Sequence, residues 1–187
     1  RRLKRRLGYV PQLIGTYPKM QVFEYLQFFA ACYHMEETKI RSRIHLLLEN
    51  AGIIAWANSP MEILPRAVLQ KLSLVRAMLH EPKILVLDDS MSSLDARTVS
   101  EMKNMLLDYM DEGRSIIITG SSLDDFSDLC THLAVLHQGK LIRKGTVAGI
   151  FRELSEQNPI VIQFNGKRTE IMGILKDDRR VKSISLK

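Results

Sequence analysis

Apolar residues fall along this chain in short, largely unbroken runs, and between the runs they recur at wider intervals. The runs occupy residues 7–10, 84–87, 115–119, 133–136 and 140–143. Runs of this length predict strands, and those at 84–87 and 115–119 favour strands buried on both faces, as in a parallel sheet. Pro11 ends the first run, and Gln138-Gly139 predicts a turn between the last two.

Between these runs, apolar residues recur at steps of three and four, which predicts amphipathic helices. The predicted helices cover residues 22–35, 39–50, 68–79 and 99–109, and another follows Thr146. In the first helix the predicted apolar face holds Val22, Tyr25, Cys32 and either Phe28 or Phe29. Such an aromatic stripe is more often core than docking surface. Alternating strands and helices predict an α/β fold with a parallel sheet.

The composition is that of an ordinary globular protein with one domain and a small appendage. Among the 187 residues, 45% are hydrophobic and 26% are charged, and the formal net charge is +6. Five of the first six residues, RRLKRR, are basic, but no aromatic residues interleave them, so we expect a solvated lead-in and no nucleic-acid partner. Cys32 and Cys130 form no CxxC pair, which argues against structural zinc or a disulfide framework.

The most distinctive chemistry lies at the end of the run at 84–87, where two carboxylates follow directly. Asp88 and Asp89 are placed at the carboxyl end of the predicted strand, which is where open α/β sheets hold their ligands. These residues alone leave open an ordinary strand stopped by a polar turn. Their neighbours favour a site, because a helix-like segment at 69–77 precedes the strand and Ser92–Asp95 follow it.

This block resembles the nucleotide-binding domain of ABC-type ATPases, from about Leu7 to about Phe151. The strand with Asp88 is similar to the Walker B segment, and residues 92–95 are similar to the D-loop. GYVPQ at 8–12 resembles the run into the Q-loop, and QKLSLVRAMLHEPK resembles the helix after the signature loop. The resemblance implies a P-loop NTPase-like fold with a helical subdomain over about residues 20–80.

The same resemblance implies a domain organisation. Residues 1–155 are expected to form a partial ABC ATPase domain. Residues 156–187 are expected to begin a small α+β C-terminal extension, with a short helix near 169–175 between apolar runs at 160–164 and 181–186.

For the site, the resemblance implies ATP and Mg²⁺. Asp88 would hold the metal through water, Gln12 would reach the metal and sense the γ-phosphate, and Asp89 would orient the attacking water. Asp95 would order the interface with a second nucleotide-binding domain, in a homodimer or a heterodimer. The other implied partner is a transmembrane permease subunit, which would hold the protein at the inner, cytoplasmic face of the cell membrane. YPKMQVFEYLQFFA looks most like the exporter branch with ABC-2-type membrane partners.

Three positions depart from the family pattern. The signature LSGGQ falls on residues 64–68, where Pro65 offers neither hydroxyl nor N–H, and Arg66 places a long cation where backbone approaches phosphate. Ala67 occupies the next position, and Arg66 could alternatively hold a phosphate by itself. Asp89 replaces the catalytic glutamate, and Ser121 stands at the position of the family's histidine.

No GxxxxGK[ST] motif occurs in the 187 residues. In the family this phosphate-binding loop precedes the Q-loop, and its strand lies between those corresponding to residues 115–119 and 133–136. The expected fold therefore lacks the P-loop strand, and the chain looks like a piece of something longer.

Two functions follow from these features, and enzymatic activity stays open between them. The first is the ATP-binding subunit of an ABC transporter, coupling ATP binding and hydrolysis to export through a membrane partner, with weakened catalysis. The alternative is a degenerate, non-catalytic domain that acts as a structural or regulatory partner. A nucleic-acid-associated ABC protein, suggested only by the basic start, lacks the long insertions or heptads such proteins need.

The expected gap in the sheet generates a prediction about stability. We expect residues 1–187 alone to be marginally stable or rearranged, because a missing central strand removes packing on both sides of the gap. Thermal unfolding followed by circular dichroism tests this. A cooperative transition at about 45–65 °C, the usual range for mesophilic domains, would contradict it.

Overall fold

The computed structural model describes residues 4–92, 94–121, 127–157, 168–177 and 181. The chain divides into two compact units, Arg1–Thr131 and His132–Lys187, and each is described separately. The predicted domain boundary near residue 155 stays a prediction. All the predicted site residues belong to the first unit.

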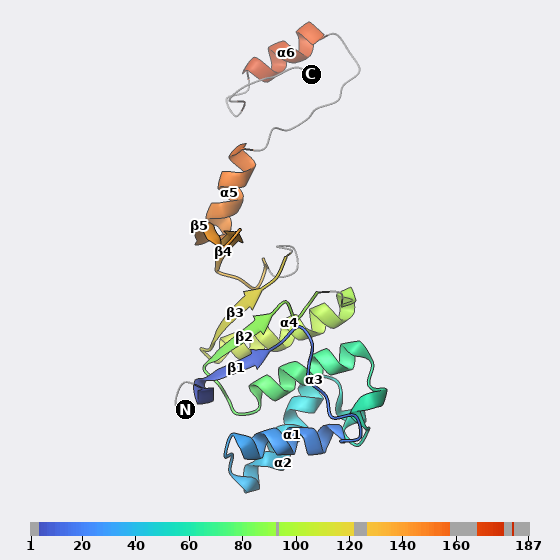
Figure 1. Ribbon diagram of the computed structural model, residues 1–187. Helices are drawn as coiled ribbons and strands as arrows, with labels where there is room; N and C mark the ends of the chain where they lie inside the picture. The colour runs from blue at the N-terminus through green and yellow to red at the C-terminus, as the bar shows by residue number, and fades with distance from the viewer. Residues whose placement is uncertain (1–3, 93, 122–126, 158–167, 178–180, 182–187) are drawn as a thin grey trace. The chain divides into compact units, whose positions relative to one another are not determined.

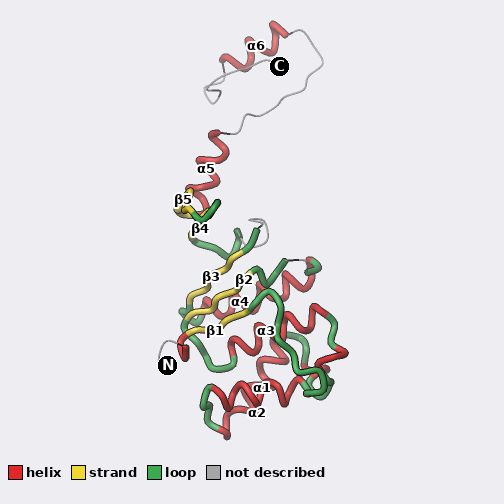
Figure 2. Tube along the Cα trace, viewed as in Figure 1, coloured by secondary structure: helices red, strands yellow, loops and turns green. Residues whose placement is uncertain are grey.

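The first unit is built on a three-stranded parallel sheet, which confirms the predicted α/β class. Its strands are β1 (Leu7–Val10), β2 (Ile84–Asp88) and β3 (Ser115–Thr119), in the order β1-β2-β3 (Figures 1 and 2). In the register of β2 with its neighbours, Tyr9 lies beside Val86, and Asp88 lies beside Thr119. The carboxyl ends of β2 and β3 are therefore level with each other.

The two faces of this sheet differ sharply in burial. Val10, Leu85 and Leu87 are completely buried in the core that includes residues of the helices α3 (Arg66–Met78) and α4 (Ala96–Asp111). On the opposite face Tyr9 is 50% exposed and Ile117 is 54% exposed. Successive strand residues point to opposite faces, so this difference runs across all three strands.

The prediction that β2 and β3 are buried on both faces is therefore wrong. In β2 only alternate residues are fully buried, and in β3 exposed residues alternate with half-buried ones. The reason is that β3 ends the sheet, and within the described residues the core lies against one face only.

Close approach between β1 and α3 depends on a glycine. A Cβ atom on Gly8 would lie 2.4 Å from the carbonyl oxygen of Ala77 and 2.6 Å from the Leu85 side chain. A side chain at this position would push the strand away from the helix, so only glycine permits the observed packing.

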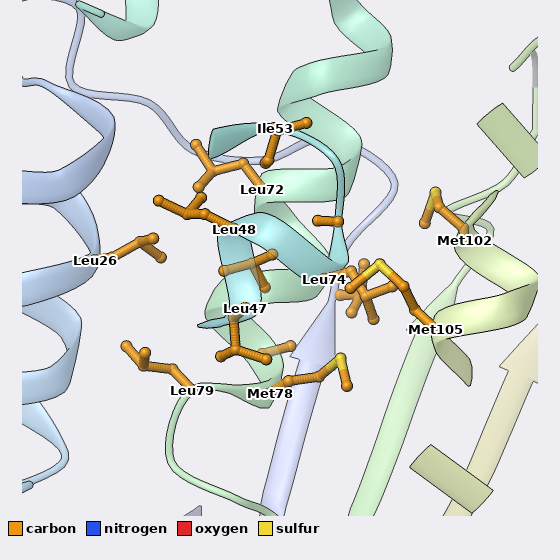
Figure 3. Close-up of a cluster of buried hydrophobic side chains, with 14 of the residues drawn as sticks. Leu26, Leu47, Leu48, Ile53, Leu72, Leu74, Met78, Leu79, Met102 and Met105 are labelled. Atoms are coloured by element: carbon orange, nitrogen blue, oxygen red, sulfur yellow. The ribbon is translucent and has the colours of Figure 1, made fainter. Parts of the chain in front are cut away.

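The helical subdomain consists of α1 (Val22–Cys32), α2 (Glu37–Asn50) and α3, with short 3₁₀ turns at Ile54–Trp56 and Met61–Ile63. Gln21 and Glu24 form a capping box at the start of α1. Figure 3 shows the resulting core, in which side chains of these helices and of α4 meet; the labelled residues are Leu26, Leu47, Leu48, Ile53, Leu72, Leu74, Met78, Leu79, Met102 and Met105. Of the two residues that could complete the apolar face of α1, Phe29 packs on the core, whereas Phe28 is 46% exposed.

The second unit begins with an antiparallel hairpin of β4 (His132–His137) and β5 (Lys140–Thr146). Gln138 and Gly139 both have positive φ, as a two-residue hairpin turn requires, which confirms the predicted turn. Helix α5 (Val147–Gln157) follows, with Ile150 buried and close to Gly145. Helix α6 (Arg168–Asp177) confirms the predicted short helix, and the predicted strand at 160–164 lies outside the described residues, as does nearly all of that at 181–186.

No described helix combines the length and the apolar character needed to cross a bilayer.

An ion pair joins α3 to α4. The Lys71 ammonium, on a side chain only 10% exposed, contacts the Glu101 carboxylate, which also accepts a hydrogen bond from Arg97 at 2.9 Å. The hydrogen bond from Lys71, followed by that from Arg97, lowers the pKa of Glu101. Glu101 is therefore the group that neutralises a nearly buried cation between two helices.

We predict that Glu101→Ala destabilises the protein by on the order of 1–3 kcal/mol, because it leaves the Lys71 ammonium without its acceptor. The matched control is Arg97→Ala. The Arg97 side chain is 88% exposed and bonds to the other oxygen of the same carboxylate, so its removal should cost less than about 1 kcal/mol of stability. Urea unfolding measures both variants. Equal losses would contradict the assignment.

His80 follows α3 and contacts the first residue of β1. Its ring stacks on Tyr33 at 3.6 Å with an interplanar angle of 7°, and its Nε2 lies 3.1 Å from the carbonyl oxygen of Leu7. Among the described residues, its buried Nδ1 has no partner. Burial lowers the pKa of His80 below its ordinary value of 6.5, although the contact with Leu7 acts in the opposite direction.

The folded state thus binds a proton on His80 less readily than the unfolded chain does. This contribution to stability is complete above about pH 6.5 and is lost as the pH falls toward the lower folded pKa. We predict that His80→Gln reduces the loss of stability between pH 7.5 and pH 5, as measured by urea unfolding. The exposed His45→Gln is the control, and identical pH profiles for His80→Gln and the wild type would refute the prediction.

Candidate active site

Asp88 is the last residue of β2, and both of its carboxylate oxygens accept hydrogen bonds from neighbouring strands. The Tyr9 hydroxyl of β1 donates to Oδ2 at 2.9 Å, and the Thr119 hydroxyl of β3 donates to Oδ1 at 2.9 Å. The alternation along each strand places all three side chains on the open face of the sheet. The Asp88 carboxylate is therefore exposed but held from two sides.

Asp89 begins the turn beyond β2 in a left-handed conformation, with φ of 48°. Its N–H is shared between the Thr119 carbonyl oxygen at 3.0 Å and the Thr119 hydroxyl at 3.2 Å. Its carbonyl oxygen accepts a hydrogen bond from the Ser92 hydroxyl at 3.0 Å. A positive φ at a non-glycine residue is uncommon and costs free energy, although aspartate adopts it more readily than most residues.

Gln12 reaches this turn from the loop after β1. Its amide Nε2 donates to Asp89 Oδ2 at 2.7 Å, although the two residues are far apart in sequence. The structure thus brings Gln12, Asp88 and Asp89 together at one edge of the sheet, as the sequence predicts.

The loop that carries Gln12 is tied to the helical subdomain at two points. Gln70 of α3 is buried and donates to the carbonyl oxygen of Pro11 at 3.2 Å. The buried Tyr25 of α1 donates to the carbonyl oxygen of Gly15 at 3.1 Å and accepts a hydrogen bond from Arg76 at 2.8 Å. The Gln12 loop is therefore bonded to both α1 and α3.

The three predicted signature residues lie at the start of α3. Pro65 is the N-cap and makes no side-chain capping bond, and Arg66 and Ala67 are the first helical residues. Arg66 is exposed, and its guanidinium lies 3.5 Å from the carbonyl oxygen of Ser92, a long contact. Of residues 64–68, where the signature is expected, the last three therefore belong to helix α3.

Asp95 occupies the N-cap of α4. Its carboxylate accepts hydrogen bonds from the Thr98 N–H at 3.0 Å and from the Thr98 hydroxyl at 2.5 Å. These bonds lower its pKa. Asp95 thus has a role within its own chain, and the predicted role at an interface between two domains stays a prediction.

Ser121 is exposed and lies two residues beyond the end of β3. No hydrogen bond of the described residues connects it to Asp88 or Asp89. Sequence reasoning missed Tyr9 and Thr119, which do contact Asp88. A signal was present, because Thr119 ends a strand predicted to lie parallel to the strand that ends in Asp88.

The donor groups at this edge fit a hard divalent cation. Mg²⁺ prefers oxygen ligands, keeps several waters and commonly uses one or two carboxylates. Asp88 offers an exposed carboxylate, and Asp89 is the next residue in the chain. Each Asp88 oxygen accepts one hydrogen bond and has a further lone pair for a bound water.

Comparisons with known proteins agree with this geometry. A sequence model of the family described as ABC transporter matches residues 1–92. The chain is 30% identical over 156 residues to the uncharacterised ABC transporter ATP-binding protein YhaQ of Bacillus subtilis, covering 83% of this chain and 52% of that protein. It is 27% identical to the Nod factor export ATP-binding protein I of Cupriavidus metallidurans, covering 75% of this chain and 46% of that protein.

Two solved structures show the same fold. One is an ATP-binding subunit of an ABC transporter, with a TM-score of 0.73, 22% identity, and coverage of 83% of this chain and 65% of that one. The other is cbiO1 of Clostridium perfringens, part of the ABC transporter complex cbiONQ, with a TM-score of 0.71, 22% identity, and coverage of 94% and 69%. The chain belongs to the family of ABC transporter ATP-binding domains, and it spans about half the length of the curated relatives it matches.

Proposed function

We propose that this protein is the ATP-binding subunit of an ABC transporter, in which ATP binding and slow hydrolysis drive export through a membrane partner. The observation that carries the proposal is the 2.7 Å hydrogen bond between Gln12 and Asp89, beside the exposed Asp88 carboxylate. An acid pair and an amide from a separate loop are the groups that align a water against a metal-bound phosphate.

Each residue has a distinct role in this proposal. Asp88 holds Mg²⁺ through bound water, and the metal, when present, neutralises charge on the phosphates. Asp89 orients the attacking water and accepts its hydrogen bond. Gln12 fixes the Asp89 carboxylate and senses whether the site is filled, because its loop is bonded to α1 and α3.

Catalysis is weakened because Asp89 is one methylene shorter than the family's glutamate. Its carboxylate reaches about 1 Å less far, and a misplacement on that scale can cost on the order of a hundredfold in rate.

The membrane partner docks beside the Gln12 loop. Large apolar side chains are exposed there and on neighbouring elements: Leu13 is 72% exposed, Tyr17 50%, Phe28 46% and Ile63 58%. Tyr17 and Phe28 pack edge to face at 6.2 Å, and the backbone of residues 18–20 bonds to the turn that contains Ile63. Exposed apolar groups gathered in this way are typical of a protein interaction site.

Other features of the proposal come from relatives. One relative is named for Nod factor export and another, LnrL of Bacillus subtilis, for linearmycin resistance, which supports export as the direction. The cbiO1 subunit is part of a transporter complex, which supports a permease partner. The proposal also includes a second nucleotide-binding domain and a position at the cytoplasmic face of the membrane, both of which the resemblance to the family implies.

The second candidate function is a non-catalytic partner domain, and the start of α3 favours it. A helix N-terminus binds phosphate through free N–H groups, but Pro65 supplies no N–H and no hydroxyl. The family's normal phosphate contact is therefore lost at this position, and a guanidinium contact from Arg66 is the alternative way to hold a phosphate there.

We predict that Asp89→Glu raises the ATP turnover of the full-length protein by up to about a hundredfold, because it restores the reach of the carboxylate. Asp89→Asn, which keeps the size and removes the charge, is the matched control and should abolish turnover. Phosphate release measures the rate, and calorimetry with Mg–ATP measures binding.

Binding without turnover in both the wild type and Asp89→Glu would favour the non-catalytic partner. Absence of any Mg–ATP binding would overturn the ATP-binding subunit and leave only a structural partner domain. Turnover at the normal rate of the family by a wild-type homodimer would overturn the weakened catalysis.

A further inference from the structure

We propose that Thr119 is the positioning residue of this site, whose hydroxyl fixes both the Asp88 carboxylate and the backbone of Asp89. The proposal rests on the function proposed above, because it assigns how the two acids are oriented for that function.

The Thr119 hydroxyl lies between the two acids and bonds to both. It donates to Asp88 Oδ1 at 2.9 Å and accepts from the Asp89 N–H at 3.2 Å. A hydroxyl has one donor and two acceptor positions, so both bonds form at once. One atom therefore connects the end of β2 to the first residue of the turn.

The strand register makes this position special. Asp88 and Thr119 are direct partners in the parallel pair of β2 and β3, and both lie on the open face of the sheet. Because the carboxyl ends of the two strands are level, the side chain of Thr119 meets that of Asp88 and its backbone meets that of Asp89.

The hydroxyl and the backbone of Thr119 contribute differently. The Asp89 N–H also bonds to the Thr119 carbonyl oxygen at 3.0 Å, and this bond does not depend on the side chain. Asp88 Oδ1, by contrast, accepts from the described residues only the bond from the hydroxyl. Loss of the hydroxyl should therefore free the Asp88 carboxylate to rotate while the turn at Asp89 largely persists.

Tyr9 provides a reporter for that rotation. Its hydroxyl donates to Asp88 Oδ2 at 2.9 Å, on the opposite side of the carboxylate from the bond that Thr119 makes. If Thr119 keeps the carboxylate in one orientation, removing its hydroxyl weakens the bond on the opposite oxygen as well.

These contacts show which residues hold each of the two acids. Two adjacent carboxylates repel each other and tend to turn apart. Thr119 and Tyr9 hold Asp88, whereas Gln12 holds the Asp89 carboxylate. Thr119 also contacts the Asp89 backbone, so it fixes the position of Asp88, which is proposed to hold the metal, relative to Asp89, which is proposed to orient the water.

The test compares Thr119→Val, which keeps the shape and removes the hydroxyl, with Thr119→Ser, which keeps the hydroxyl. Ser115→Ala, at the other end of β3, is the control for general effects on the strand. Thermal unfolding verifies that each variant is folded. All variants are made in the full-length protein.

The first readout is the affinity for Mn²⁺ in the presence of ATP, followed by electron paramagnetic resonance. Substitution of residues that orient metal ligands typically costs 10–100-fold in metal affinity, so Thr119→Val should weaken Mn²⁺ binding by about tenfold or more. Thr119→Ser and Ser115→Ala should stay within about twofold of the wild type. Equal losses in Thr119→Val and Thr119→Ser, or no loss in either, would overturn the proposal.

The second readout needs no nucleotide. The NMR signal of the Tyr9 ring reports whether its hydroxyl still bonds to Asp88, with Tyr9→Phe to assign the signal and Asp88→Asn to show the fully released position. In Thr119→Val the Tyr9 signal should move toward its position in Asp88→Asn, and in Thr119→Ser it should not. An unchanged Tyr9 signal in Thr119→Val would refute the positioning role.

The two readouts separate the two proposals. A wild type that binds neither Mn²⁺ nor ATP would refute the proposed function, and the NMR signal of Tyr9 would still decide the role of Thr119. A wild type that binds both, with no effect of Thr119→Val on either readout, would refute the positioning role alone.

Discussion

The parallel pairing of β2 with both of its neighbours is the constraint on which the site depends. That pairing places the end of β1, the acids after β2 and the end of β3 at the same edge of the sheet. Among the described residues, each side-chain hydrogen bond to the Asp88 or Asp89 carboxylate comes from an element next to β2 in space and far from it in sequence. The chemistry is therefore assembled by register, and a strand shifted by one residue would turn Asp88 toward the helices.

Much of the fold could be predicted from the sequence because it depends on local patterns. The spacing of apolar residues located α1 to α4, and Gln138-Gly139 located the hairpin turn, since each pattern acts within a few residues. The burial of β3 could not be predicted in this way. Three successive isoleucines indicate a buried strand, but burial is decided by what packs on each face, and in the structure Ile117 is 54% exposed.

The candidate site likewise contains residues that local sequence patterns predict and residues that only the structure reveals. Asp88 and Asp89 were predicted because a carboxylate pair after an apolar run is visible in the sequence, and Gln12 was predicted because GYVPQ resembles the run into the Q-loop of ABC ATPases. Tyr9 and Thr119 were missed, because a tyrosine and a threonine in strands are ordinary residues there, and only the register shows that they meet Asp88. The local role of Asp95 was also missed, although an aspartate three residues before Thr98 is a common N-cap.

The exposed face of the sheet has a consequence for handling the protein. Tyr9, Val86 and Ile117 form a cross-strand row with little cover among the described residues, and β3 ends the sheet. A β-branched apolar strand at a sheet edge is a template on which another chain can add a strand. When residues 1–187 are produced by themselves, aggregation should therefore rise steeply with protein concentration. A charged residue in place of Ile117 should raise the yield of soluble protein.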